Sequence, residues 1–277
     1  MFGTTKRSRD GDAVVTGAGS GIGAAFAIEL ADRGNRVICS DIDETAARRT
    51  VDIITDQGGI ATANQCDVSQ VDEVKALADQ AQSWFDGPPT LVINNAGVGA
   101  GGQPIGEIPL DDWSWTLGVN LWGPIHGCHV FTPILREAGT GGIINVASAA
   151  SFGAAPGMAA YNVSKAAVLS LSETLAAELS ASGVHVTVLC PTFVKTNIID
   201  AGRITGESTE LAAKLMRWTR ISAQRTARMC LDTYDRGGLY CMPQFDARIG
   251  WGIKRLAPTT FTRTVGLVSR IGSAVSS

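Results

Sequence analysis

A short β-branched run, Ala13 to Thr16, leads directly into the glycine-rich turn Gly17-Ala18-Gly19-Ser20-Gly21-Ile22-Gly23. The next residues, 24–33, favour a helix that Gly34 ends. Glycines in such a turn let the backbone approach a pyrophosphate, and the helix N-terminus offers free N–H groups to the phosphates. A glycine pattern alone can be a tight turn without a ligand. The strand before it and the helix after it favour a dinucleotide-binding unit.

The rest of the chain repeats this alternation of strands and helices. Strands are expected at residues 36–41, 60–66, 90–93, 142–147, 184–190 and 239–242, and helices at residues 43–57, 70–85, 110–137, 161–182, 209–218 and 220–235. The segments 98–109, 151–158 and 191–208 are expected to be loops. The alternation predicts an α/β fold, a single Rossmann-type doubly wound parallel sheet of about seven strands with helices on both faces. Right-handed crossovers then place the loops after the strands along one edge, where ligands bind.

Length and composition agree with one large α/β domain, because the chain has 277 residues and 45% of them are hydrophobic. We expect residues 1–244 to form a dinucleotide-binding and catalytic domain, with a substrate lid at about 192–235, and residues 245–277 to form a basic amphipathic extension.

Asp41 ends the second expected strand and lies near the spacing at which a carboxylate binds the adenosine ribose hydroxyls. A carboxylate there repels a 2′-phosphate, and neither Ser20 nor Ile42 supplies a compensating positive charge. The sequence therefore predicts NAD rather than NADP. The alternative is that Asp41 caps the following helix, which Asp43 could do equally well. Asp67, after the third strand, could reach the adenine edge.

Tyr161 and Lys165 are four residues apart in an Ala-rich helical run, so their side chains project from one face. A nearby ammonium favours the phenolate, and the pair is a candidate general acid/base with a lowered tyrosine pKa. This spacing is common in ordinary helices, so it carries weight only together with the other motifs.

With these motifs assembled, the chain resembles a short-chain dehydrogenase/reductase of the compact, non-extended type over residues 12 to about 242. The motifs are the turn from Thr16 to Gly23, Asn94-Asn95-Ala96-Gly97, Asn120, Ser148 and the Tyr161/Lys165 pair. The resemblance implies the catalytic residues Asn120, Ser148, Tyr161 and Lys165. Residues and resemblance together imply NAD contacts from Gly17, Gly19, Ser20, Gly21, Ile22, Gly23, Asp41, Asp67, Val68, Asn94, Ala96, Gly97, Tyr161, Lys165, Pro191, Val194 and Thr196.

The resemblance also implies a role for each catalytic residue. Tyr161 exchanges a proton with the substrate oxygen, and Ser148 orients that oxygen. Lys165 holds the nicotinamide ribose and keeps Tyr161 acidic. Asn120 holds a water that relays the proton from Lys165. Pro124 has no N–H to bond to the Asn120 carbonyl, and we hypothesise that this carbonyl binds the relay water. A kink without catalytic meaning is the alternative.

Two departures from the family pattern bear on the site and on assembly. Thr192 follows Pro191 where many relatives carry glycine, which could stiffen or re-aim the loop at the nicotinamide. The usual Val-Asp-Gly-Gly ending, which builds a tetramer interface in relatives, is absent. A homodimer through the Asn120 and Tyr161 helices is therefore expected, and a tetramer is in doubt.

The expected substrate pocket contains Val98, Phe152, Met158 and Phe193, and further apolar residues line the loops: Ala154, Ala155, Ile198, Ile199, Leu215, Met216 and Trp218. An apolar pocket with few polar groups favours a bulky secondary alcohol or ketone of steroid, terpenoid, aryl or lipid type. The alternative function is a non-catalytic nucleotide-binding redox sensor or scaffold, which would not need the Tyr161/Lys165 pair.

The six cysteines have no disulfide-like or metal-ligand spacing and are expected to be reduced. His126 and His129 lack a third ligand, so no metal is expected. The sequence lacks a secretory signal and a spanning apolar run, which favours a cytoplasmic protein, and no nucleic-acid partner is indicated. Residues 1–202 carry a net charge of −10 and residues 203–277 a net charge of +7. We expect the basic tail to pack on the body or on a partner subunit, with peripheral membrane contact as second choice.

Overall fold

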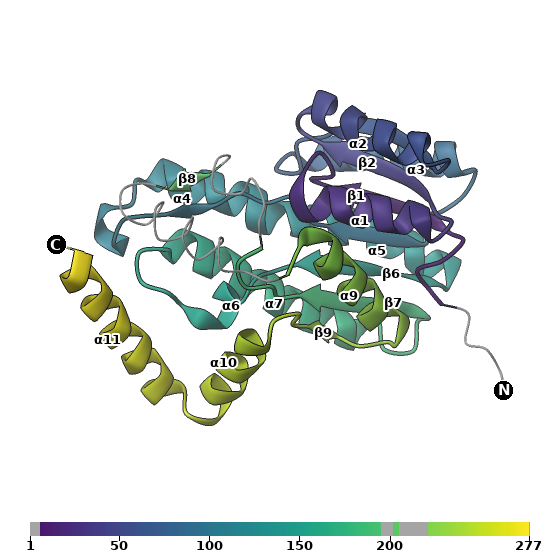
Figure 1. Ribbon diagram of the computed structural model, residues 1–277. Coiled ribbons are helices and arrows are strands. Elements are labelled where there is room, and N and C mark those ends of the chain that lie inside the picture. Colours follow the sequence, from purple (N-terminus) through teal and green to yellow (C-terminus); the bar gives the residue numbers. More distant parts are fainter. Residues whose placement is uncertain (1–5, 195–201, 205–220, 277) are drawn as a thin grey trace.

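The computed structural model describes residues 6–194, 202–204 and 221–276. Within them, seven strands form one parallel sheet in the order β3-β2-β1-β4-β6-β7-β9 (Figure 1). The strands are β1 (Asp12–Thr16), β2 (Arg36–Asp41), β3 (Ile60–Gln65), β4 (Leu91–Asn94), β6 (Gly141–Val146), β7 (Val184–Leu189) and β9 (Tyr240–Cys241). The predicted Rossmann-type sheet is confirmed. Its strand order reverses between β1 and β4, and open sheets bind ligands at such a reversal.

Helices cover both faces of the sheet. One face carries α1 (Gly21–Asp32), α2 (Glu44–Asp56) and α9 (Ala223–Asp235), and the other carries α3 (Val71–Phe85), α5 (Gly123–Ala138) and α7 (Ala159–Glu178). Successive strand side chains point to opposite faces. Val15 of β1 therefore joins the core with Phe26 and Tyr234, whereas Val14 joins the core with Leu77 and Phe131. Burial on both faces explains why the central strands are continuously apolar.

A buried arginine joins α1 to α9. Arg33 is only 7% exposed and forms ion pairs with Glu29 at 3.0 Å, Asp232 at 2.9 Å and Asp235 at 3.2 Å. Its guanidinium also donates to the Ser8 hydroxyl at 2.8 Å. These contacts fix the N-terminal segment and α9 against the first helix.

The helix expected over residues 110–137 is interrupted. It consists of α4 (Leu110–Leu117), a π-helical turn (Gly118–Trp122) and α5, and the N–H of Gly123 donates to the carbonyl of Gly118, five residues back. Pro124 follows this wide turn at the start of α5. The predicted irregularity beside Asn120 is therefore present, while a water on the Asn120 carbonyl stays a prediction.

Three expected loops contain short regular elements. The segment after β4 contains β5 (Ala100–Gly101), which pairs with β8 (Arg203–Ile204), and the short helix η1 (Ile105–Glu107). The segment after β6 contains the single helical turn α6 (Ala150–Gly153). The prediction of plain loops was wrong there, because elements of two to four residues are too short to show periodicity. The helix expected at 209–218 lies outside the described residues.

The C-terminal extension forms two helices, α10 (Phe245–Leu256) and α11 (Pro258–Ser276). Glycines at 250, 252 and 266 disfavour helix formation, yet both helices are present. Ala247 and Trp251 of α10 pack against the body, and the Trp251 ring lies 5.2 Å from the Tyr240 ring. The expected packing on the body is thus confirmed for one side of α10, while α11 leads away from the sheet (Figure 1).

Candidate active site

The turn between β1 and α1 has the conformation that a pyrophosphate site needs. Gly17 and Gly21 have φ angles of +64° and +57°, in the left-handed region that glycine adopts without strain. A Cβ at Gly23 would collide with the Gly17 carbonyl oxygen, so α1 can pack this closely only with glycine there. The Ser20 side chain makes no capping hydrogen bond, and it leaves the first N–H groups of α1 to other acceptors. The turn therefore presents backbone donors suited to phosphate.

Asp41 is fixed against this turn. One carboxylate oxygen accepts the backbone N–H of Gly19 at 2.8 Å, and the other accepts that of Asp43 at 3.0 Å. Asp43 itself caps α2 through the N–H groups of Thr45 and Ala46. The alternative that Asp41 serves as the cap of α2 is therefore wrong.

Asp67 and Val68 follow β3 at the same edge of the sheet. The Asp67 carboxylate accepts the N–H of Ser69 at 2.9 Å, so it shapes its own turn. Val68 is buried, and its carbonyl lies 2.9 Å from Nδ1 of His126 on α5. The edge beyond β3 is thus joined to the helix that follows the π-helical turn.

The segment Asn94–Gly97 approaches the glycine turn from β4. The Asn94 side chain points into the core, where Nδ2 donates to the Asn145 side chain at 2.8 Å. A cofactor contact predicted for Asn94 can therefore come only from its backbone.

Asn95 and Thr16 are positioning residues, and the sequence analysis named them in its motifs without assigning either a role. Asn95 Nδ2 donates to the carbonyls of Thr16 at 2.9 Å and Gly17 at 3.2 Å. The Thr16 hydroxyl accepts the N–H groups of Asn95 and Ala96. Polar side chains at the ends of two neighbouring strands were the available signal, and they tie the β4 loop to the glycine turn.

The side chains of Asn120 and Lys165 both approach Gly97. A Cβ at Gly97 would come within 3.1 Å of Asn120 Oδ1 and 3.3 Å of Lys165 Nζ. Asn120 is fully buried, and its amide clamps the backbone of Val98 by accepting its N–H at 2.7 Å and donating to its carbonyl at 2.9 Å. Lys165 Nζ donates to the Val146 carbonyl at 3.0 Å. Burial lowers the pKa of Lys165 to about 8.

Tyr161 projects from α7 beside Ser148, which follows β6. Burial raises the pKa of Tyr161, and hydrogen bonding with Ser148 lowers it by less. The predicted lowering of this pKa was wrong for the protein alone, because desolvation of the phenolate dominates. Lys165 Nζ lies 5.8 Å from the centre of the Tyr161 ring. The Ser148 hydroxyl also donates to the Pro191 carbonyl at 3.4 Å. Three polar groups, from Ser148, Tyr161 and Lys165, thus converge at the end of β6.

Comparison with known proteins identifies the family of this chain. The family model for short chain dehydrogenases matches residues 12–204. The chain belongs to the short-chain dehydrogenase/reductase family.

Individual members of the family match over most of this chain. It is 38% identical to a 1-deoxy-11-beta-hydroxypentalenate dehydrogenase from Streptomyces exfoliatus, over 77% of this chain and 80% of that protein. It is 42% identical to the probable oxidoreductase EphD of Mycobacterium tuberculosis (strain ATCC 25618 / H37Rv) over 67% of this chain. That match spans only 31% of EphD. A short-chain dehydrogenase/reductase from Burkholderia phymatum, solved in complex with NAD, superposes with a TM-score of 0.84 at 35% identity, covering 91% of this chain and 96% of that one.

The residues of this chain fit a dinucleotide. At Gly19 a Cβ would come within 2.5 Å of the Ala46 Cβ and 2.8 Å of the Asp41 carboxylate, so only glycine lets the turn pack this closely against α2 and Asp41. The Asp41 carboxylate borders this turn at Gly19, and the Lys165 ammonium lies near Gly97 on the segment that follows β4. The chain thus offers anion-binding N–H groups and two side chains suited to ribose hydroxyls.

The loop after β7 is described only in part. Val194 is buried, and the N–H of Thr192 donates to the Gln244 side chain at 3.1 Å. Gln244 precedes α10 and was not predicted to influence the site. The loop that carries Pro191-Thr192 is therefore bonded to the C-terminal segment through Gln244. Thr196, the predicted contact to the nicotinamide carboxamide, lies outside the described residues.

The predicted substrate residues separate into two groups. Val98 is held by Asn120, Met158 immediately precedes α7, and Phe193 is partly exposed on the loop after β7. Phe152 is 6% exposed and packs with Val168 in the core beneath α10 instead. Of the further apolar residues, Ile198, Ile199, Leu215, Met216 and Trp218 lie outside the described residues.

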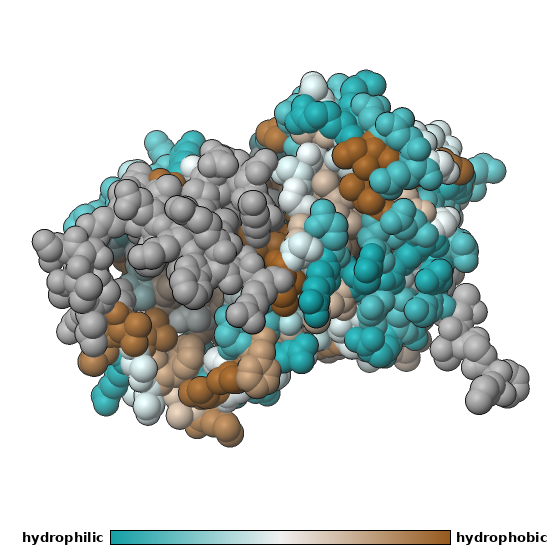
Figure 2. Space-filling view, in the orientation of Figure 1, coloured by the Kyte–Doolittle hydropathy of each residue, from teal (hydrophilic) through white to brown (hydrophobic). Residues whose placement is uncertain are grey.

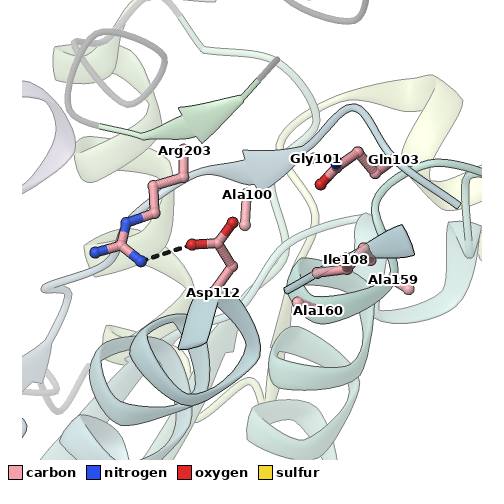
Figure 3. Close-up of a pocket in the computed structure, with 8 residues that line it drawn as sticks. All are labelled: Ala100, Gly101, Gln103, Ile108, Asp112, Ala159, Ala160 and Arg203. Atoms are coloured by element: carbon pink, nitrogen blue, oxygen red, sulfur yellow. Dashed lines mark hydrogen bonds and ion pairs between the residues drawn. The ribbon is translucent and has the colours of Figure 1, made fainter. Parts of the chain in front are cut away.

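A small pocket lies beside the start of α7, between β5, η1 and α4 (Figure 3). Arg203 of β8 pairs with Asp112 of α4 at 2.6 Å along its rim and stacks on the Trp115 ring at 4.4 Å. Ala159 and Ala160, directly before Tyr161, form part of its wall. The sequence analysis missed this pair because Asp112 and Arg203 are far apart in the chain.

Proposed function

We propose that this protein is an NAD(H)-dependent dehydrogenase that interconverts a secondary alcohol and a ketone. The observation that carries the proposal is the convergence of Ser148, Tyr161 and Lys165 at the end of β6, with Asn120 also close to Gly97. A nucleotide-binding sensor would have no need for a hydroxyl, a phenol and an ammonium at one point. An oxidoreductase needs them to hold an oxygen and to move its proton.

The side chains divide the chemistry as follows. Ser148 orients the substrate oxygen, and Tyr161 takes its proton during oxidation or returns it during reduction. Lys165 holds the nicotinamide ribose. NAD, when bound, supplies the hydride acceptor. Because burial raises the pKa of Tyr161, the phenol is protonated at neutral pH in the protein alone and is ready to donate to a ketone. Alcohol oxidation, which needs the phenolate, is therefore expected to accelerate as the pH rises above neutral.

NAD is proposed over NADP because of Asp41. Its carboxylate is anchored to the Gly19 N–H at 2.8 Å and cannot turn away without losing that bond. A 2′-phosphate placed there would meet a like charge. We expect a preference for NAD of at least about tenfold in kcat/KM, which corresponds to about 1.4 kcal/mol.

A bulky apolar substrate is proposed over a sugar or a small hydroxy acid. Support comes from Val98, Met158 and Phe193 near the catalytic groups and from the similarity to a dehydrogenase named for a hydroxylated pentalenate. The only charged side chains that line the small pocket among the described residues are Asp112 and Arg203, and their charges neutralise each other.

The test is NADH formation at several pH values with NAD or NADP and a panel of cyclic, aryl and long-chain secondary alcohols. Polyols and small hydroxy acids complete the panel. We expect turnover of the apolar alcohols with NAD and its loss in Tyr161→Phe. Turnover restricted to the polar alcohols would refute the substrate class. NADH binding without turnover of any alcohol or ketone would favour the sensor instead.

A homodimer is also proposed. Leu110, Trp122 and Val163 expose large apolar surfaces on α4, the π-helical turn and α7. These are the elements through which the family resemblance implies dimer formation. Sedimentation of the protein with and without Trp122→Glu tests this assignment.

A further inference from the structure

The side of α10 that faces away from the body is apolar. Phe245, Ile249, Ile253 and Leu256 recur at helical spacing and are 74%, 46%, 47% and 89% exposed. Spacings of three and four residues place them on one side of the helix. Ala247 lies on the opposite side and packs in the core. A surface helix normally has the reverse arrangement, with its polar side outward.

The apolar surface extends towards α11. Leu267 and Val268 are also largely exposed, whereas Phe261 is half-buried near Gly250 of α10. Figure 2 shows hydrophobic residues gathered at the lower edge of the molecule, where α10 meets α11. The two helices thus form one apolar surface, which we call the α10–α11 surface.

The segment that forms this surface is basic. Arg248, Lys254, Arg255 and Arg263 stand against a single acid, Asp246, over residues 245–268. In the described part of the chain, none of these four cations takes part in an ion pair.

Two of the cations are held in place without being neutralised. Arg248 Nε donates to the Met242 carbonyl at 2.8 Å, and the Arg255 guanidinium stacks on the Trp251 ring at 4.7 Å. Both contacts fix a positive charge beside the apolar stripe and leave it without a counter-charge. The occupant of the surface must therefore be both apolar and anionic.

We propose that the α10–α11 surface binds an anionic lipid bilayer, with Phe245, Ile249, Ile253 and Leu256 entering the headgroup region. Basic amphipathic helices bind in this way, through buried apolar area and attraction to acidic headgroups. No helix among the described residues is long and apolar enough to cross a membrane, so the helices would lie in the interface. This inference goes beyond the proposed dehydrogenase activity.

A second copy of the chain is the competing occupant. A two-fold contact of this surface with itself would place the Arg248 and Arg255 charges of both copies close together, which is unfavourable. A bilayer containing acidic lipid satisfies the apolar stripe and the flanking charges at once. The observations therefore favour the bilayer.

The test is co-sedimentation of the full chain with vesicles of phosphatidylcholine, with or without phosphatidylglycerol. We expect binding to the vesicles that contain phosphatidylglycerol, weakened by added salt, and much weaker binding to phosphatidylcholine alone. Ile249→Ser/Leu256→Ser should raise the lipid concentration for half-binding by roughly tenfold. Ile53→Ser/Ile60→Ser removes two similarly exposed side chains on α2 and β3 and should bind as the wild type does.

Both double variants change exposed side chains, and unaltered thermal unfolding shows that each is folded. Failure of the wild type to sediment with phosphatidylglycerol vesicles would overturn the proposal. Equal binding by Ile249→Ser/Leu256→Ser and the control variant would do the same. Sedimentation equilibrium decides the competing case. A lower assembly state in Ile249→Ser/Leu256→Ser, with no vesicle binding by the wild type, would assign the surface to a second copy.

Discussion

Replacement of Lys165 by methionine is expected to stabilise the cofactor-free protein at pH 7 while abolishing turnover. Lys165 is 3% exposed, and its Nζ donates to the Val146 carbonyl at 3.0 Å. Burial lowers its pKa from 10.5 to about 8. The ammonium is therefore held in a place that does not favour its charge.

The size of the effect follows from that shift. One pKa unit corresponds to about 1.4 kcal/mol, so the buried charge costs roughly 3 kcal/mol at pH 7. Methionine removes the charge but leaves the Val146 carbonyl without its donor, at a cost of about 1–3 kcal/mol. The net gain is expected to be about 1 kcal/mol, or roughly 2 °C in Tm for a protein of this size.

The pH dependence is a sharper test than the gain itself, because it does not depend on how well methionine packs. Below about pH 8, Lys165 is charged in both the folded and the unfolded protein. Between this value and 10.5 the folded protein releases the proton and the unfolded protein keeps it. The wild type therefore gains stability relative to Lys165→Met as the pH rises, by up to roughly 3 kcal/mol.

Denaturant unfolding of the wild type, Lys165→Met and Lys165→Arg at a series of pH values from neutral to alkaline provides the assay. Arginine keeps its charge throughout, so this control should show no comparable alkaline gain. A free-energy difference between Lys165→Met and the wild type that stays constant over the series would refute the reasoning.

Three further changes have defined outcomes. Asp41→Ser should reduce the preference for NAD over NADP by about tenfold, measured as the ratio of kcat/KM values. Arg33→Met removes the ion-pair partner of Asp232 and Asp235 and should cost about 3–5 kcal/mol in denaturant unfolding. Pro124→Ala restores an N–H that can bond to the Asn120 carbonyl, and kcat should fall with little change in KM if that carbonyl holds a water. An unchanged kcat would show that the π-helical turn has no role in catalysis.

Much of the fold could be predicted because its signals are local. The apolar runs that form β1, β4 and β6 predict strands because such strands are buried on both faces. The second strand, β2, also lies over residues 36–41 as expected. The break between α4 and α5 is different. It depends on Asn120 bonding to the backbone of Val98, a contact between segments distant in sequence. Periodicity predicted one long helical stretch there, and only Pro124 indicated an irregularity beside Asn120.

The prediction of the site failed where the answer depended on burial. Spacing alone placed Tyr161 and Lys165 on one helix face, but the sign of a pKa shift depends on what covers that face. In the protein alone, burial raises the pKa of Tyr161 and lowers that of Lys165. Both shifts favour the uncharged forms, the neutral phenol of Tyr161 and the neutral amine of Lys165, until other polar groups enter the site. Ribose hydroxyls beside Lys165 would offset its desolvation and favour the ammonium. That ammonium in turn favours the Tyr161 phenolate, so the phenolate needed for oxidation would be stabilised mainly in the complex.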